Sequence, residues 1–155
     1  MKILCFDQAT NISGYSVFDD SKLITYGVLN SDHEEKNTLE RLKQMTDEIV
    51  KLTKKIKPDV VILENIQMQR NVATFKSLAQ LQGMIMYYLN KSNICYWYIE
   101  PTAWKSFCKI KGRSRKEQKP NTIKFVKEVY NIDLTEDEAD AIGIGYWAIK
   151  HIKEN

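Results

Sequence analysis

Two short apolar runs, at residues 60–63 and 94–99, each follow a long stretch in which apolar residues recur at helical spacing, at 39–56 and 72–89. A strand that follows a helix usually returns to the same sheet by a right-handed crossover and pairs in parallel. We therefore expect a helix–strand–helix–strand order to build the parallel half of a sheet. This order constrains the fold more than any other feature of the chain.

The chain before these helices reads as β structure. Residues 2–6 form an apolar run, and residues 14–18 and 22–29 alternate on either side of the turn signal Asp19-Asp20-Ser21. Together the two halves predict an α/β fold, with a mixed five-stranded sheet that begins with an antiparallel meander and carries helices on both faces.

The rest of the chain is predicted to be helical, with one interruption. We expect a helical turn or two at 102–108, a basic mobile loop at 109–119, and helices at 121–130 and from 135 to about 152. No linker or repeat divides the 155 residues, so we expect a single domain over residues 1–155.

Composition adds information about location and partners. No apolar run reaches the roughly 18 residues of a membrane span, and the three cysteines lack metal-ligand spacing, which predicts reduced thiols in the cytoplasm. The net charge is only +3, but residues 105–124 hold eight Lys or Arg and one acid, whereas acids concentrate at 133–140. This split predicts that one face meets an anionic partner.

Four carboxylates stand at positions where a metal site would need them. Asp7 and Glu64 each come directly after an apolar strand, and Asp137 and Asp140 are three residues apart at the start of a helix, so they share a face. Each acid alone also fits an ordinary turn or helix-start residue. Their joint placement favours a site of hard oxygen ligands, which selects Mg²⁺ or Mn²⁺ over zinc.

A pair of such cations suits phosphodiester hydrolysis. One ion lowers the pKa of a bound water and the other stabilises the departing oxygen. The basic stretch at 105–124 would hold the polyanionic backbone of a nucleic acid near these acids. The sequence thus points to a metal-dependent nuclease.

Several motifs resemble those of RuvC-type Holliday junction resolvases, in the order that this family has them. The resemblance covers nearly the whole chain and lies in the following segments: DQATNISGYSV from Asp7, VVILENIQ from Val60, PTAWK from Pro101, and DEADAIGI from Asp137. In addition, Lys116 lies eleven residues beyond Lys105, which is the spacing of two functional lysines in the family.

The resemblance implies an RNase H-like fold and an active site made of Asp7, Glu64, Asp137 and Asp140 as metal ligands, with Mg²⁺ as cofactor and Mn²⁺ also supporting activity. It implies no small-molecule cofactor. It further implies that Lys116 lies at or near the reacting phosphate and acts in catalysis.

The resemblance also implies how the protein meets DNA. Lys105 would contact the backbone near the scissile phosphate, and a homodimer through the helix at 72–89, which is apolar nearly all round, would cut opposite strands of a four-way junction. Arg113, Arg115 and Lys119 would grip phosphates beside Lys116, although an ordinary solvated charge run has the same pattern. Arg70 would reach DNA near the junction centre.

The chain departs from the family at two places. Gln8-Ala9 replaces the common Pro-Gly, and Gln67 stands where the family often has a base-stacking aromatic, so that Met68 is the candidate to replace it. Such divergence is typical of phage-encoded relatives with broader branched-DNA substrates. Trp97 and Trp104 are predicted to lie in the core.

Three other functions fit part of the pattern. An RNase H-type nuclease of the same fold would need no dimer, and a junction-binding protein could keep the fold without cutting. An ATPase related to actin and sugar kinases also opens with strand, Asp and hairpin, but it needs a Gly-rich phosphate loop, and the six glycines here form no such cluster. The four acids favour the nuclease that cleaves junctions.

Overall fold

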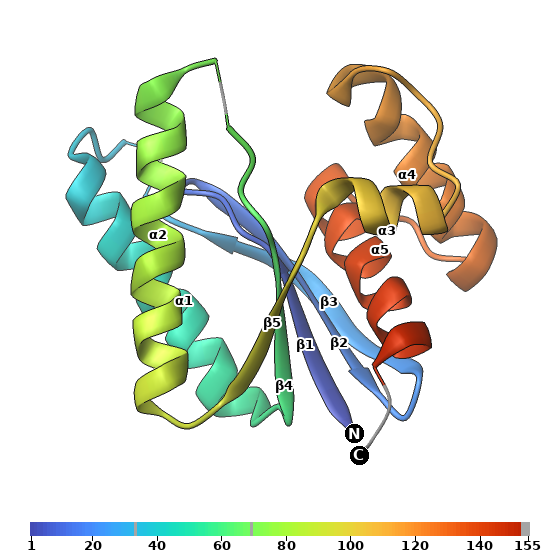
Figure 1. Cartoon of the computed structure of the whole chain (residues 1–155), viewed down its shortest axis with the longest axis horizontal. Coiled ribbons are helices and arrows are strands. Elements are labelled where there is room, and N and C mark those ends of the chain that lie inside the picture. Colours follow the sequence, from blue (N-terminus) through green and yellow to red (C-terminus); the bar gives the residue numbers. More distant parts are fainter. Residues whose placement is uncertain (33, 69, 153–155) are drawn as a thin grey trace.

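A computed structural model of the chain describes residues 1–32, 34–68 and 70–152. Its centre is a five-stranded sheet in the order β3-β2-β1-β4-β5 (Figure 1). The strands are β1 (Lys2–Asp7), β2 (Ile12–Asp19), β3 (Lys22–Asn30), β4 (Val60–Glu64) and β5 (Cys95–Ile99). β1, β2 and β3 pair antiparallel, whereas β4 pairs in parallel with both β1 and β5. The predicted mixed sheet is confirmed.

Helices cover both faces of this sheet. α1 (Thr38–Ile56) and α2 (Val72–Lys91) lie on one side, and α3 (Pro101–Phe107), α4 (Arg115–Tyr130) and α5 (Glu136–His151) lie on the other (Figure 1). Successive residues of a strand point to opposite faces. Accordingly, Leu4 and Phe6 of β1 enter the core under α1 and α2, while Ile3 and Cys5 enter the core under α5.

Helix α5 lies unusually close to β2. A Cβ atom built on Gly14 of β2 would stand 1.9 Å from the backbone oxygen of Asp137, so no other residue fits there without moving the helix. Near the middle of the contact, the Ser16 hydroxyl donates a hydrogen bond of 2.6 Å to the carbonyl of Ala141. This close packing brings the start of α5 to the end of the sheet where β1 finishes.

The segment 109–119, predicted as a mobile loop, is helical in its second half, so the prediction is wrong there: α4 begins at Arg115. The Ser114 hydroxyl caps the helix by accepting a hydrogen bond from the Glu117 amide at 3.3 Å. Pro120 lies inside the helix, where it lacks the N–H that continues the hydrogen-bond ladder. The segment was predicted as a loop because it is polar and basic and contains Gly112, so that no apolar pattern marks the start of the helix.

The prediction that Trp97 belongs to the core is also wrong, because its side chain is 59% exposed. Trp97 is paired with Ile62 of β4 but lies on β5, the edge strand. Ile62 is covered on both sides by neighbouring strands, whereas the edge position leaves the indole open to solvent. Trp104, in α3, is fully buried as predicted.

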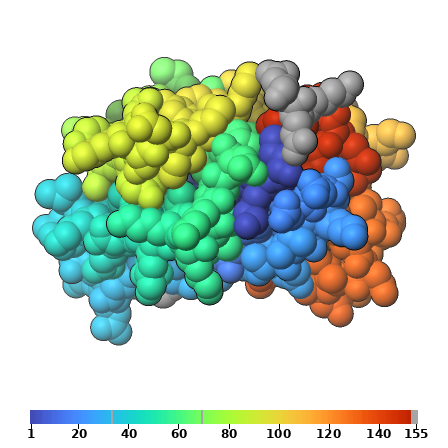
Figure 2. Space-filling model, turned by 90° about the horizontal axis from the view of Figure 1, so that it is seen from below, coloured from blue at the N-terminus to red at the C-terminus, as the bar shows by residue number. Residues whose placement is uncertain are grey.

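The two ends of the sheet differ in what they expose. On the face in Figure 2, the start of β1 emerges between the end of α1 and the β2–β3 turn, and Lys2 and Asp59 exchange hydrogen bonds there. The carboxyl ends of β1 and β4 lie at the opposite end of the sheet. Among the helices in the described ranges, none is long and apolar enough to cross a membrane.

Candidate active site

The carboxyl ends of β1 and β4 carry two acids side by side. Asp7 is the last residue of β1 and Glu64 the last of β4, and the preceding residues Phe6 and Leu63 are paired in parallel. Asp140 of α5 joins them, and all three line one cavity of about 1010 Å³. Asp137 does not line this cavity, but its charge acts on Asp7.

Burial raises the pKa of all three acids that line the cavity. Burial raises the pKa of Asp7 well above its usual range, and the nearby charges of Glu64 and Asp140 raise it further, while Arg115 acts in the opposite direction. Burial also raises the pKa of Glu64 and of Asp140. The cluster therefore holds more negative charge than its surroundings balance.

Particular neighbours lower these pKa values without offsetting burial. For Glu64 the main one is a hydrogen bond of 2.7 Å that the indole N–H of Trp104 donates to its Oε1 atom, followed by the charge of Lys105. For Asp140 they are the charges of Lys105 and Arg115 and a hydrogen bond with the Thr122 side chain. The acids are thus held by specific partners and not left to bulk solvent.

A divalent cation fits this donor set. The three carboxylates supply hard oxygen ligands and repel one another, and a cation between them would relieve the repulsion. Within the described residues, however, no three acid, thiol or imidazole side chains stand close enough together to make a finished metal site. The acids therefore converge on one cavity without forming a closed ligand shell.

The cations predicted to bind DNA divide into two groups. Arg70, Lys105, Arg113 and Arg115 line the same cavity as the acids. Lys105 is steadied there, because its Nζ atom donates a hydrogen bond of 3.2 Å to Gln118 and lies 5.3 Å from the centre of the Trp104 ring.

The second group lies outside the lining. Lys119 forms an ion pair with Glu136 and lowers the pKa of Asp140. Lys116 is exposed and is not among the residues that line the cavity. Of the two lysines that the resemblance singled out, then, only Lys105 faces the acids from the cavity wall.

One side of the cavity is formed by the segment after β4. Gln67 and Met68 both line it, and Met68 is 90% exposed. An apolar side chain that is almost wholly in solvent gains nothing from folding. Its position at the rim makes it available to an incoming ligand.

Sequence reasoning missed three residues that fix Glu64. Trp104 was expected only to fill the core, yet it donates to the carboxylate. Gln8, directly after β1, and Gln82, in α2, both donate side-chain hydrogen bonds to the backbone carbonyl of Glu64. The parallel pairing of β4 with β5 was the available signal for Trp104, because the residues after β5 must then start near the end of β4. For the two glutamines the sequence held no signal.

Comparisons with known proteins identify the family of this chain. The chain matches the model of the family "Crossover junction endodeoxyribonuclease RuvC" over residues 3–151. It is 30% identical to the crossover junction endodeoxyribonuclease RuvC of Fusobacterium nucleatum, over 98% of this chain and 80% of that protein.

Two solved structures share the fold. One is T. thermophilus RuvC in complex with a Holliday junction substrate, with a TM-score of 0.75, 14% identity, and coverage of 97% of this chain and 96% of that one. The other is the Fowlpox virus resolvase with substrate Holliday junction DNA, with a TM-score of 0.67, 19% identity, and coverage of 97% of each chain. From its sequence, its fold and its cluster of acids, this chain belongs to the RuvC family of crossover junction endodeoxyribonucleases.

Proposed function

We propose that residues 1–155 act as one nuclease domain that resolves four-way DNA junctions by nicking two opposite strands, in the cytoplasm. The observation that carries the proposal is the single cavity in which Asp7, Glu64 and Asp140 face a rim of Lys and Arg side chains. Acids alone would repel a phosphodiester, and cations alone would only bind it. Together they suit hydrolysis of a DNA backbone.

The family is divalent-metal dependent, and we propose Mg²⁺ as the cofactor here, with Mn²⁺ able to replace it. Asp7, Glu64 and Asp140 would hold it, with Asp137 as the fourth acid. When bound, a pair of such ions activates a water as nucleophile and stabilises the leaving oxygen. Trp104 holds the Glu64 carboxylate in place for this task.

The positive rim supplies the grip on DNA. Lys105, beside the acids, would contact the backbone next to the scissile phosphate, and Arg70 and Arg113 would contact phosphates farther out. Lys116 and Lys119 extend the positive surface along α4. Met68, exposed at the rim, would pack against bases at the junction centre, where they are less fully stacked. A methionine is less selective than a ring, and this favours branched DNA of several kinds as substrate.

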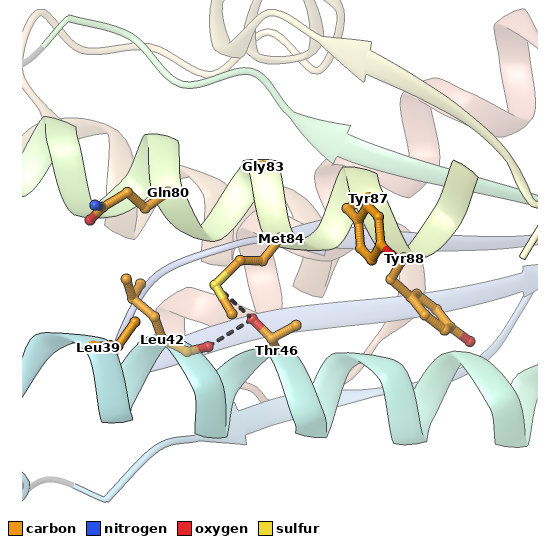
Figure 3. Close-up of a pocket in the computed structure, with 8 residues that line it drawn as sticks. All are labelled: Leu39, Leu42, Thr46, Gln80, Gly83, Met84, Tyr87 and Tyr88. Carbon is orange, nitrogen blue, oxygen red and sulfur yellow. Dashed lines mark hydrogen bonds between the residues drawn. The ribbon is translucent and has the colours of Figure 1, made fainter. Parts of the chain in front are cut away.

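A homodimer through α2 would place two such sites on one junction. Between α1 and α2 lies a mainly apolar groove of about 540 Å³, and its lining comprises Leu39, Leu42, Thr46, Gln80, Gly83, Met84, Tyr87 and Tyr88 (Figure 3). Tyr87 is 66% exposed and Leu39 is 64% exposed, so the groove opens to solvent in a single copy. An exposed apolar surface of this kind favours burial against a partner.

Gly83 supports the helix α2 of a second copy as the partner. A glycine inside a helix costs about 1 kcal/mol relative to alanine, and crowding usually explains why one is kept. Here a Cβ atom at Gly83 would meet nothing within 4 Å. The missing side chain therefore makes room for something outside this chain, and helices approach closest where glycine lies at their contact. A two-fold axis through this point would bring two copies of α2 together.

An immobile four-way junction, labelled in turn on each strand, tests the function. With Mg²⁺ the protein should nick two opposite strands at symmetric positions, and without a divalent metal it should not cut. Asp7→Asn should bind the junction yet cut at least about 10²–10³-fold more slowly. Preferred cleavage of an RNA–DNA hybrid would favour the RNase H-type alternative, and binding without cleavage under all conditions would favour a non-cleaving junction-binding protein.

A further inference from the structure

The first two turns of α4 face the acid cluster with one row of side chains. Arg115 and Gln118 line the cavity, Thr122 hydrogen bonds with Asp140, and Lys119 lowers the pKa of Asp140. These four positions are spaced by three, four and seven residues from Arg115, and so they occupy one face of the helix. The phase of α4 relative to the active site is therefore fixed by contacts along its length and does not depend on one side chain.

Within this row, Arg115 has the widest influence on the acids. Its charge lowers the pKa of Asp7, Glu64 and Asp140 alike. Yet across the described part of the chain, its guanidinium has no ion pair within 4.0 Å and no hydrogen bond. A structural arginine so near three carboxylates would pair with one of them. Arg115 instead lines the same cavity as the three acids, and within the described residues no ion pair joins it to them.

The neighbouring Lys116 is placed differently. Successive residues of an α-helix point about 100° apart, so Lys116 cannot share the direction of Arg115. It is exposed and lies outside the cavity lining. Two other cations near the acids already have partners: Lys105 donates to Gln118, and Lys119 pairs with Glu136.

We propose that Arg115, and not Lys116, is the catalytic cation that binds the scissile phosphate. This inference rests on the proposed function and names the residue that neutralises the reacting group. A guanidinium presents two parallel N–H donors that match two oxygens of one phosphate, and it stays protonated even beside developing negative charge. Such a cation stabilises the transition state more than the ground state, because charge on the phosphate oxygens changes as the bond breaks.

The test compares Arg115→Ala, Arg115→Lys and Lys116→Ala in single-turnover cleavage of a four-way junction with Mg²⁺, with junction affinity measured separately in EDTA. Arg115→Ala should lower the cleavage rate about 10²–10³-fold while junction affinity falls less than about tenfold. Arg115→Lys should recover part of the rate, because it restores the charge without the paired donors. Lys116→Ala should lower the single-turnover rate much less than Arg115→Ala does, and it should mainly weaken binding as salt rises.

The opposite pattern would overturn the inference: a large loss of rate in Lys116→Ala, with Arg115→Ala cutting as fast as the unmodified protein. Because the Arg115 side chain is exposed and unpaired, its variants should keep the circular dichroism spectrum and Tm of the parent. If the unmodified protein itself fails to cut junctions with metal present, the proposed function fails first, and the two failures are thereby distinguished.

Discussion

The two hollows described above, the acid-lined cavity at the carboxyl edge of the sheet and the groove between α1 and α2, are opposite in character. In the cavity, half-buried carboxylates repel one another and share the lining with cations. In the groove, apolar and aromatic side chains stand open around a glycine that has no neighbour (Figure 3). One hollow is costly to the isolated fold because of unbalanced charge, and the other because of uncovered apolar surface. Under the proposed function, each cost would be relieved by a different partner, a cation with DNA in the first case and a second chain in the second.

Helix α2 connects the two hollows. Gln82 donates a hydrogen bond of 3.1 Å to the backbone carbonyl of Glu64, and the next residue, Gly83, faces the groove. A partner that presses on α2 therefore acts one residue away from a group that holds the end of β4. Substitutions in one hollow or the other therefore test whether the cavity and the groove act independently.

The largest effect is expected from Gly83→Leu, which changes only the groove. In a single chain the leucine meets open space, and it improves helix propensity by up to about 1 kcal/mol, so Tm of the monomer should rise or stay constant. At a helix contact between two copies, overpacking costs about 1–3 kcal/mol per copy, which weakens the dimer by about 30-fold to 10⁴-fold. Analytical ultracentrifugation measures the dimer.

Ala73→Leu provides the matched control, because Ala73 is an exposed small residue of the same helix outside the groove lining. It should leave the dimer unchanged. On junctions, Gly83→Leu should still nick single strands but lose the coupling between the two cuts. A Gly83→Leu protein that dimerises as before would place the dimer contact elsewhere.

An intermediate effect is expected from Trp104→Phe, which acts on the acid cluster and leaves the groove unchanged. Removing the hydrogen bond to Glu64 removes the largest influence that lowers the pKa of this acid, so that pKa should rise. Because Glu64 must be ionised to hold a cation, the acidic limb of the cleavage profile should move to higher pH. The cleavage rate and the affinity for Mg²⁺ should fall about 10- to 100-fold.

Trp97→Phe tests whether any loss of a tryptophan has this result. Trp97 is exposed on the edge strand and has no part in the site, so its substitution should leave both the pH profile and the dimer intact. If Trp104→Phe lowers the rate equally at every pH, its role is packing against α5 and not the ionisation of Glu64.

The smallest effect concerns stability. The raised pKa values mean that the native state binds protons at these acids more tightly than the unfolded chain does, so stability falls as pH rises from the ordinary carboxyl range, about 4, through the raised values. Asp7→Asn removes one of the repelling charges. At neutral pH in EDTA its Tm should exceed that of the parent by about 2–4 °C, the shift that 1 kcal/mol produces in a chain of this size.

This difference should shrink below about pH 4, where Asp7 is neutral in both states. Added Mg²⁺ should stabilise the parent more than the variant. Thermal scans across pH check both points. A variant less stable than its parent at neutral pH would mean that Asp7 contributes packing or hydrogen bonds that outweigh its repulsion.

Much of the fold follows from sequence because it depends on local periodicity. The strand at Val60–Glu64 is a continuous apolar run and the helix at Thr38–Ile56 has apolar residues at a period of 3.6, and both patterns can be read without knowledge of the rest of the chain. The acids at strand ends follow from the same patterns, because parallel strands end at one edge. The two predictions that were wrong concern features that local periodicity does not reveal. The start of α4 is hidden in a basic, polar segment, and the exposure of Trp97 depends on the order of strands in the sheet.

In the site, the kinds of residue were predictable but their directions were not. Lys116 lies eleven positions after Lys105. This spacing does not show which side chains of a helix face the site when the first residue of the helix is predicted wrongly. The structure shows that α4 begins at Arg115 and that Gln118 and Thr122 are on its side toward the acids. Arg115 shares this side of the helix, and Lys116 does not.

The contact at Gly14 has a consequence for how such a nuclease can vary. The distance between Asp7 of β1 and the acids of α5 depends on a close backbone contact. At this contact Gly14 of β2 lies against the main chain of Asp137, and there is no room for a side chain. Surface charges, the rim and the groove can all diverge while this gap stays constant. A single methyl group at position 14 would widen this gap and abolish activity, although every charged residue would still be present. The spacing of the catalytic acids therefore depends on Gly14, which carries no charge and no side chain.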